Sequence, residues 1–435
     1  MSRRLDARKP GFEAQFQALL NAKREQGSDL AQTVREIIAD VRARGDAALL
    51  ELTSRLDRFA VTLETLRLTD SEIAAGRAAC DGPALAALDV AAARIEAYHR
   101  RQLPRDEMFT DDTGAQLGWR WTPIDSVGVY VPGGTASYPS SVLMNAIPAL
   151  VAGVGRIAMV TPASGGNLNP LVIAAAQRVG VSEIYRIGGA QAIAALAFGT
   201  ATIAAVDKIV GPGSDYVAQA KREVFGHVGI DSVAGPSEVL VVADGASDPE
   251  WVAADLAAQA EHDASSQCIL ITDDAALADK VDEAIVRVLA LLPRRKIAEA
   301  SWRNHGAIIV VASLDDAPPL VDRIAPEHLE ISTSNPDTLL KAVRHAGAIF
   351  LGRHTPEAMG DYIAGPNHVL PTSRTARFSS GLSVLDFLKR TTLLSCTPQT
   401  LSALGADAIA LADAEGLDAH ARSIAARLNL PKQAR

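Results

Sequence analysis

Two adjacent ionisable residues, Glu327 and His328, carry the strongest chemical signal in this sequence. A carboxylate and an imidazole can each accept a proton, and they do so at different ordinary pKa values. Pro326 precedes the pair and restricts the backbone that leads into it. Proton transfer and a charge pair at a sheet edge explain the pattern about equally well.

A second chemical pattern, Gln259-Ala-Glu-His262, offers two side chains that can bind a metal. Their spacing within a helical run places Gln259 and His262 on one helix face. A histidine nitrogen is a common metal ligand, and a glutamine carbonyl is a weaker, harder one. Asp263 or Asp361 could supply charge. Two ligands do not make a site, and a solvated histidine at a helix end is the commoner cause of this spacing.

Glycine-rich turns are candidates for phosphate contacts. The run 153–158 matches the letters of a dinucleotide fingerprint, but it precedes a strand-like run, whereas a fingerprint follows one. The run 211–216 is better placed, so its N–H groups could face a phosphate, or Ser214 or Asp215 could cap the next helix. Gln191 also opens a helix and could reach a ligand, although a surface glutamine is the commoner case.

Alternating elements must position these residues. Residues 14–103 are predicted to be helical, and residues 104–122 are predicted to form a connection. From residue 127 onward, short strand-like runs alternate with helical ones, which indicates parallel sheets covered by helices. A boundary near 234–237 divides two tandem α/β units, and residues 399–430 predict a helical appendage.

The predicted elements have the following bounds. Strands are predicted over 127–131, 156–160, 183–187, 207–210, 238–242, 267–272, 307–311, 329–332 and 346–351. Helices are predicted over 170–178, 190–198, 216–225, 248–261, 275–292, 317–324 and 337–345.

The composition excludes several classes of protein. A chain of 435 residues is longer than one core supports, so two or more domains are expected. The net charge is −9 with no basic block, which argues against a nucleic-acid partner. The apolar stretch 142–160 contains Asn145, Pro148 and Arg156, which argues against a membrane span.

The termini and cysteines indicate a cytoplasmic protein. The basic N-terminus lacks the apolar run of a signal peptide. Cys80, Cys268 and Cys396 lie far apart and are odd in number, which favours buried thiols in a reducing compartment.

Several longer runs occur together in a specific order. They are residues 128–134, 187–191, 234–238, 259–263, 325–329, 365–371 and 378–381. On these runs the chain resembles the histidinol dehydrogenase family, from about residue 30 to residue 425. Each run is weak by itself, and their joint order is what makes the resemblance specific.

The resemblance implies an α/β fold of two incomplete Rossmann-like domains with parallel sheets, plus small helical extensions. It implies an N-terminal extension (1–25), a first domain (26–127 with 237–380), a second, cofactor-side domain (128–236), and a C-terminal helical tail (381–435) that reaches the partner subunit. The resemblance further implies a homodimer in which the two subunits share each active site.

The resemblance also implies the reaction. Members of the family oxidise L-histidinol to L-histidine through L-histidinaldehyde, in two successive hydride transfers to NAD, with one Zn²⁺ per subunit. The nearest alternative is a zinc- and NAD-dependent dehydrogenase of the same architecture that acts on another amino or sulfonated alcohol. A zinc hydrolase and a non-catalytic binding protein for imidazole compounds are more distant alternatives.

The family's site residues map onto matching positions here. Glu327 and His328 match the catalytic acid–base pair and also contact substrate. One departure is Ser214, which stands where the family usually has asparagine. Serine is shorter and has no amide donor, so a cofactor contact there would pass through water. The implied zinc and substrate ligands are Gln259, His262, Asp361 and, from the partner, His420; further substrate contacts are Ser237, His368 and Glu415; cofactor contacts are Tyr130, Gln191 and Ser214.

Overall fold

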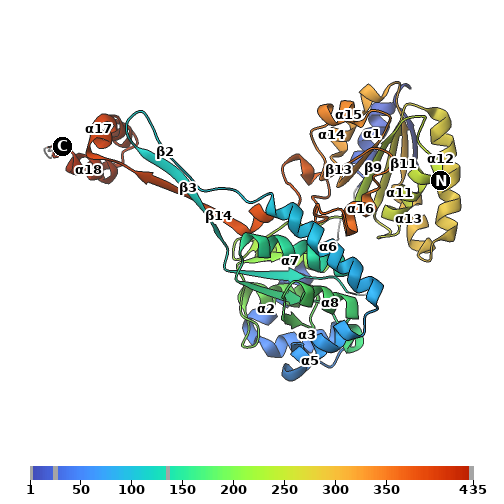
Figure 1. Cartoon of the computed structure of the whole chain (residues 1–435), viewed down its shortest axis with the longest axis horizontal. Helices are drawn as coiled ribbons and strands as arrows, with labels where there is room; N and C mark the ends of the chain where they lie inside the picture. The colour runs from blue at the N-terminus through green and yellow to red at the C-terminus, as the bar shows by residue number, and fades with distance from the viewer. Residues whose placement is uncertain (1–2, 23–27, 134–137, 431–435) are drawn as a thin grey trace. The chain divides into compact units, whose positions relative to one another are not determined.

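The computed structural model describes residues 3–22, 28–133 and 138–430. The chain divides into two compact units, and Figure 1 labels many of their elements. Unit 1 comprises Met1–Gln102 with Asp125–Asp386, and unit 2 comprises Leu103–Ile124 with Phe387–Arg435. Within the described residues, the structure contains no helix of the length and apolarity that crossing a membrane requires.

The first sheet of unit 1, named here the β4 sheet, has five parallel strands. Numbered along the chain, its strands run in the order 3-2-1-4-5, which is the Rossmann order without its sixth strand. In spatial order they are β6 (Glu183–Tyr185), β5 (Arg156–Val160), β4 (Ser126–Tyr130), β7 (Lys208–Val210) and β8 (Gly229–Ile230).

Helices cover this sheet and carry its crossovers. The connecting helices are α7 (Pro139–Ala152), α8 (Pro170–Arg178), α9 (Gly189–Phe198) and α10 (Asp215–Val224). The earlier helices α2 (Ser28–Arg44), α3 (Asp46–Leu56), α5 (Asp70–Ala78) and α6 (Gly82–Arg100) pack against them, with α2 on α9 and α6 on α7. One hydrophobic core joins α2 and α3 to the β4 sheet.

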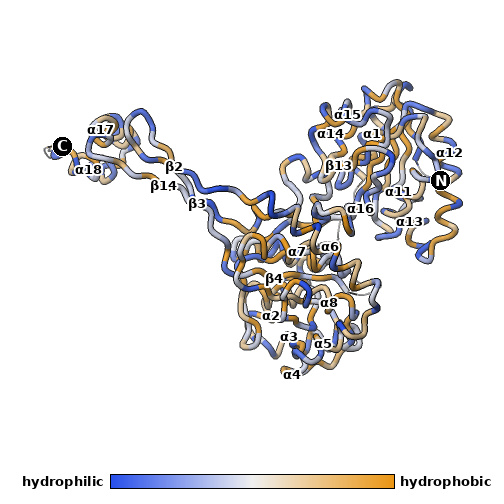
Figure 2. The backbone as a smooth tube through the Cα atoms, in the orientation of Figure 1, coloured by the Kyte–Doolittle hydropathy of each residue, from blue (hydrophilic) through white to orange (hydrophobic). Residues whose placement is uncertain are grey.

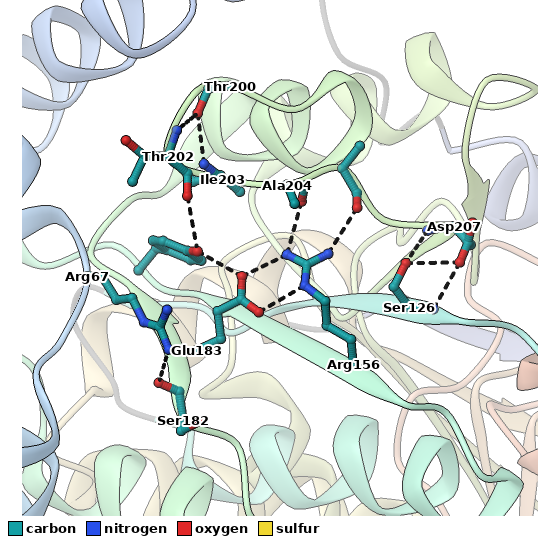
Figure 3. Close-up of polar contacts among 12 residues, drawn as sticks. Arg67, Ser126, Arg156, Ser182, Glu183, Thr200, Thr202, Ile203, Ala204 and Asp207 are labelled. Atoms are coloured by element: carbon teal, nitrogen blue, oxygen red, sulfur yellow. Dashed lines mark hydrogen bonds and ion pairs between the residues drawn. The ribbon is translucent and has the colours of Figure 1, made fainter.

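Polar contacts tie together the amino edge of the β4 sheet (Figure 3). Arg156 makes a two-pronged ion pair with Glu183, at 2.9 and 2.7 Å, and donates to the backbone oxygens of Ala204 and Ala205. Asp207 accepts from the backbone and hydroxyl of Ser126, both at 2.9 Å. Two-pronged pairs of this kind have a specific geometry, so the pair fixes the position of Arg156 relative to Glu183.

The second sheet of unit 1, named here the β9 sheet, has six parallel strands. Five of them repeat the 3-2-1-4-5 order, and the N-terminal strand adds to the edge. In spatial order they are β1 (Arg3–Asp6), β11 (Ala307–Val310), β10 (Gln267–Thr272), β9 (Glu238–Ala243), β12 (His328–Ser332) and β13 (Ala348–Leu351).

Both faces of the β9 sheet are buried, so every residue of β9 and β10 is buried. Such strands read as continuous apolar runs rather than alternating ones. One core contains α11 (Pro249–Ala260), α12 (Ala275–Leu291) and α13 (Arg295–His305). Another contains α1 (Phe12–Leu20), α14 (Ala317–Ile324) and α15 (Pro336–Ala342).

Unit 2 is a three-stranded antiparallel sheet with two helices. The sheet order is β14-β3-β2, from β14 (Leu388–Ser395), β3 (Gln116–Pro123) and β2 (Glu107–Thr110). The helices are α17 (Pro398–Ala414) and α18 (Asp418–Arg427), which pack on each other. The chain that leads into β2 is hydrophilic (Figure 2).

The predicted fold class is confirmed, and so are all nine predicted strands. The helices predicted over 170–178 and 317–324 have the observed bounds. The predicted connection over 104–122 is wrong, because this segment forms β2 and β3 and pairs with β14. Gly118 and Pro123 within β3 obscured its strand character.

The contacts show which segments pack together. Residues 3–6, within the segment expected to be an N-terminal extension, form β1 and pair with β11 in the β9 sheet. Helices α2, α3, α5 and α6 were expected to group with residues 237–380, but they pack on the helices of the β4 sheet. The C-terminal tail was expected to begin at residue 381, whereas unit 2 takes the chain from Phe387 and includes Leu103–Ile124.

Candidate active site

The amino edge of the β9 sheet gathers most of the predicted catalytic residues. His328 begins β12 and Glu238 begins the neighbouring strand β9. Helix α11 runs back to this edge before β10, so Gln259 in its last turn lies there too. The Glu327 carboxylate accepts the Glu238 backbone N–H at 2.9 Å. Ligands of open α/β sheets usually lie at the carboxyl edge, so this site is at the opposite end.

A tight turn delivers Glu327 and His328 into the sheet. Ala325, at the end of α14, has a φ of 47°, a left-handed conformation that is uncommon for a residue with a side chain. Pro326 follows, and the backbone oxygen of Glu327 then accepts from Ala348 at 2.9 Å. A Cβ atom on Gly347 would lie 2.6 Å from that oxygen, so the approach requires glycine. Strained backbone of this kind is concentrated at functional sites.

The His328 imidazole is buried among carboxylates. Its Nδ1 lies 3.1 Å from the backbone oxygen of Glu238 and 3.7 Å from carboxylate oxygens of both Glu327 and Glu357. Its Nε2 lies 3.5 Å from Asp361. Burial alone would lower the pKa of His328, but the charges of Glu327, Glu357 and Asp361 outweigh burial and raise this pKa well above its ordinary value.

Two of these carboxyl groups have raised pKa values. Burial raises the pKa of Glu327 to about 7, against the lowering effects of His328 and the Glu238 backbone. Burial also raises the pKa of Glu357 to about 8, again opposed by His328. A carboxyl group with a pKa near neutral is suited to acid–base catalysis.

Sequence reasoning missed Glu357, which begins α16 (Glu357–Tyr362) and is 1% exposed. One signal for it was present. Glu357 and Asp361 are four residues apart, so on a helix they share a face.

The predicted zinc ligands of unit 1 converge on the same place. The Gln259 amide nitrogen lies 3.0 Å from Glu357, and its oxygen lies 2.9 Å from the Glu238 N–H. Burial lowers the pKa of His262, which favours the neutral form that binds metals, while the charge of Asp361 opposes this. Burial would raise the pKa of Asp361, but the close approach of His328 and the charges of the nearby imidazoles lower it overall.

This donor set fits zinc, which takes nitrogen and oxygen ligands. The Nε2 atom of His328 and one oxygen of Glu357 are buried and have no hydrogen-bond partner within the described part of the chain. Within that same part, no three His, Cys, Asp or Glu side chains form a ready metal cluster. The predicted ligand set includes Gln259, which is outside those four residue types, and His420, which the resemblance assigns to the partner subunit.

The remaining predicted substrate residues lie in different parts of the structure. His368 Nδ1 lies 2.9 Å from the backbone oxygen of Asp361, and its Nε2 lies 3.4 Å from the Ser141 hydroxyl. Ser237 directly precedes Glu238 at the amino end of β9 and is half-buried. Glu415 and His420 belong to unit 2, where both are exposed at the junction of α17 and α18.

The three predicted cofactor residues line one cavity of about 710 Å³ at the carboxyl edge of the β4 sheet. Tyr130 ends β4, and its hydroxyl accepts the Gly189 N–H at 3.1 Å. Burial raises the pKa of Tyr130 to about 12, so it stays neutral. Gln191 is 1% exposed, and its amide oxygen and nitrogen have no partner among the described residues. An amide buried in this way at a cavity fits a polar ligand.

A glycine turn that is held by hydrogen bonds places Ser214 at the cavity. Gly211 has a φ of 110°, and its backbone N–H donates to Asp231 at 2.8 Å. Lys221 donates to the Gly211 backbone oxygen at 3.0 Å and makes a buried ion pair with Asp231. Ser214 stands at the N-cap position of α10, but its side chain makes no capping hydrogen bond. The hydroxyl is therefore not used as a helix cap.

A Rossmann-type sheet with a cavity at its switch point, together with a buried carboxylate–imidazole cluster, is typical of an α/β enzyme that binds a nucleotide cofactor. The comparisons with known proteins specify it further. The chain belongs to the histidinol dehydrogenase family, whose family model matches residues 20–428.

Relatives match over their full length. Histidinol dehydrogenase of Rhizobium meliloti is 61% identical over 433 residues, which cover 100% of both chains. That of Rhodopseudomonas palustris is 61% identical over 429 residues, covering 99% of this chain and 100% of the relative. The crystal structure of histidinol dehydrogenase from Elizabethkingia anophelis is 35% identical and covers 98% of each chain, with a TM-score of 0.94.

Proposed function

We propose that this protein oxidises L-histidinol to L-histidine through L-histidinaldehyde, in two successive hydride transfers to NAD, as a step of histidine biosynthesis in the cytoplasm. The names of its full-length relatives support the substrate. The observation that carries the proposal is the position of His328. Its Nε2 atom is buried without a hydrogen-bond partner among the described residues and lies 3.5 Å from Asp361, a predicted zinc ligand.

The metal site would use Gln259, His262 and Asp361 of one subunit. Zinc bound there would supply a template that orients the imidazole and amine of the substrate. The carboxylates around His328 raise its pKa, and a bound cation would offset their charge, which favours the neutral imidazole that a base requires.

The two bases have distinct roles. His328 takes the hydroxyl proton of histidinol at Nε2 while hydride leaves the adjacent carbon for NAD. Glu327 then takes a proton from the water that attacks the aldehyde carbon. After His328 has released its first proton to solvent, it accepts the hydroxyl proton of the resulting hydrate as the second hydride leaves. A Glu327 pKa of about 7 makes it a stronger base than an ordinary carboxylate, while much of it is ionised at neutral pH.

The cofactor would bind in the cavity of the β4 sheet, where NAD supplies the hydride acceptor. Tyr130 is positioned there by its hydrogen bond from Gly189, and Gln191 offers both an amide donor and an acceptor. Ser214 lines the same cavity, and its hydroxyl makes no helix-capping hydrogen bond. It would reach the cofactor through water.

A homodimer with shared active sites completes the proposal. Glu415 and His420 are exposed in unit 2, and each would serve the active site of the partner subunit. Mixing a Gln259→Ala variant with a His420→Ala variant should then restore part of the activity, because some mixed dimers hold one intact site. Verified mixed dimers without any recovery would contradict sharing.

Metal content and NAD reduction on the purified protein test the function directly. We expect about one zinc per chain, NADH formation from histidinol, and loss of both after chelation. Faster oxidation of a sulfonated or another amino alcohol would favour the alternative substrate. Turnover without NAD would indicate a hydrolase, and tight histidinol binding without turnover would indicate a binding protein.

A further inference from the structure

The cavity of the β4 sheet lacks an acidic residue at the usual place. In a sheet of this order, an Asp or Glu at the end of the second strand binds the ribose hydroxyls of NAD. Here the second strand is β5, and the segment 161–170 that follows it contains no acidic residue. Any carboxylate for the ribose must come from another element.

Three acidic residues from the preceding helices line the cavity: Glu36, Asp40 and Asp57. Two of them already have partners. Asp40 makes a two-pronged pair with Arg44, at 2.6 Å for each contact, and Glu36 accepts from Gln32 at 2.7 Å. Asp57 differs, because its Oδ2 atom is buried and has no hydrogen-bond partner among the described residues.

Asp57 lies on the side of the sheet where an adenosine would bind. It stands at the C-cap of α3, and the backbone N–H of Gly188, which follows the third strand, β6, lies near enough to lower the pKa of its carboxyl group. A Cβ atom on Gly188 would lie 2.5 Å from Pro162, which follows the second strand. Asp57 is therefore held beside the carboxyl ends of strands two and three, the adenosine half of a Rossmann sheet.

The backbone next to Asp57 has an uncommon conformation, which supports a functional role for this residue. Arg58, the next residue, has a φ of 53°, a left-handed conformation that non-glycine residues adopt rarely. Burial raises the pKa of Asp57, and the nearby backbone N–H of Gly188 opposes this. A buried carboxylate oxygen without a donor is costly unless a ligand supplies one.

We propose that Asp57 accepts hydrogen bonds from the adenosine ribose diol of NAD and thereby selects NAD over NADP. This rests on the proposed use of NAD. A 2′-phosphate would place negative charge against a carboxylate in a cavity that Glu36 and Asp40 also line. Arg55 is the one cation among the described residues that line the cavity, and its charge contributes to lowering the pKa of Asp40.

Calorimetric binding to the full-length protein without histidinol tests this role apart from activity. In Asp57→Asn, affinity for NAD and for ADP-ribose should fall by about 10- to 100-fold, because a charged acceptor is lost. Affinity for nicotinamide mononucleotide should stay within about twofold. The preference for NAD over NADP should shrink, because the repulsive charge is gone.

Asp40→Asn is the matched control, since it removes an acid of the same cavity that is paired with Arg44. It should change ADP-ribose affinity by about twofold or less. Asp57→Ser is a second variant in case the first misfolds, and thermal unfolding checks both. Unchanged ADP-ribose affinity in a folded Asp57 variant, with a wild type that binds NAD, would overturn this inference alone. A wild type that binds no NAD would overturn the proposed function as well.

Discussion

The Nδ1 atom of His328 lies 3.1 Å from the backbone oxygen of Glu238. A carbonyl oxygen only accepts hydrogen bonds, so Nδ1 carries the ring proton in the neutral imidazole. The basic nitrogen is therefore Nε2, which faces Asp361 at 3.5 Å. Because the acceptor is backbone, no side-chain substitution at Glu238 removes it, and the tautomer is set by the pairing of β9 with β12.

Replacing His328 tests its role as the base in both oxidations. His328→Asn should lower the rates of histidinol and histidinaldehyde oxidation by about 10²- to 10⁴-fold, the usual contribution of general-base catalysis. Zinc content should be retained, since His328 is not a proposed ligand. Single-turnover NADH formation and metal analysis measure both quantities. A loss of zinc in proportion to activity would mean that His328 acts through the metal site instead.

Glu327→Gln separates the second oxidation from the first. The amide oxygen can still accept the Glu238 N–H that Glu327 now accepts at 2.9 Å, so the local structure should persist. Without a carboxylate to activate water, aldehyde oxidation should fall by about 10²-fold, with a smaller effect on alcohol oxidation. Rates measured with histidinaldehyde supplied directly decide this. A normal aldehyde rate would show that another group activates the water.

Glu357 should support zinc binding without being a ligand. Glu357→Ala removes the acceptor that lies 3.0 Å from the Gln259 amide nitrogen, so the ligand loses its orientation. Zinc affinity should fall by about 10- to 100-fold, the usual cost of losing such a support. Glu357→Gln is the matched control, because its amide oxygen can still accept from Gln259. Competition with a zinc-binding dye measures the affinities, and equal zinc affinity for the alanine variant and the wild type would refute this role.

The carboxyl pair formed by Asp255 on α11 and Glu330 on β12 should make stability depend on pH. Burial raises the pKa of Asp255 to about 6, and burial together with the neighbouring charge of Asp255 raises that of Glu330 well above its ordinary value. Between about pH 4 and pH 6 the folded protein keeps a proton that the unfolded chain releases, so stability falls as pH rises. Above the folded-state pKa values both states have lost the proton, and the free energy of unfolding falls no further.

Asp255→Asn removes this loss of stability. The variant should match the wild type near pH 4 and unfold with a free energy about 2 kcal/mol higher at pH 8. Glu330→Gln should show the same trend, although Glu330 also accepts the Glu357 backbone N–H at 2.7 Å. Thermal and urea unfolding at several pH values measure it. Parallel pH profiles for variant and wild type would show that the pair holds no proton.

The sequence revealed elements whose own periodicity defines them. Helices 170–178 and 317–324 each begin at or beside proline and carry an apolar face, so their bounds were visible. Strand β14 was not visible, because its pairing with β3 is a long-range contact that local pattern does not encode. The packing of α2 on α9 is of the same kind.

The sequence predicted which residue types form the candidate site, but it did not predict at which edge of the sheet they lie. The Glu327–His328 and Gln259–His262 patterns identified ionisable groups, but alternation of strands and helices does not tell which edge of a sheet they occupy. Glu357 became apparent only when α16 was placed against β12, where the Glu357 backbone N–H donates to Glu330. Its four-residue spacing from Asp361 is a sequence signal for a shared helix face, but that spacing does not indicate that Glu357 is buried.

The stoichiometry of the complete reaction tests the central proposal most directly. With histidinol limiting and NAD in excess, the protein should form two NADH for each histidinol and release histidine as the final product. One NADH for each histidinol, with histidinaldehyde released, would contradict a four-electron oxidation at one site.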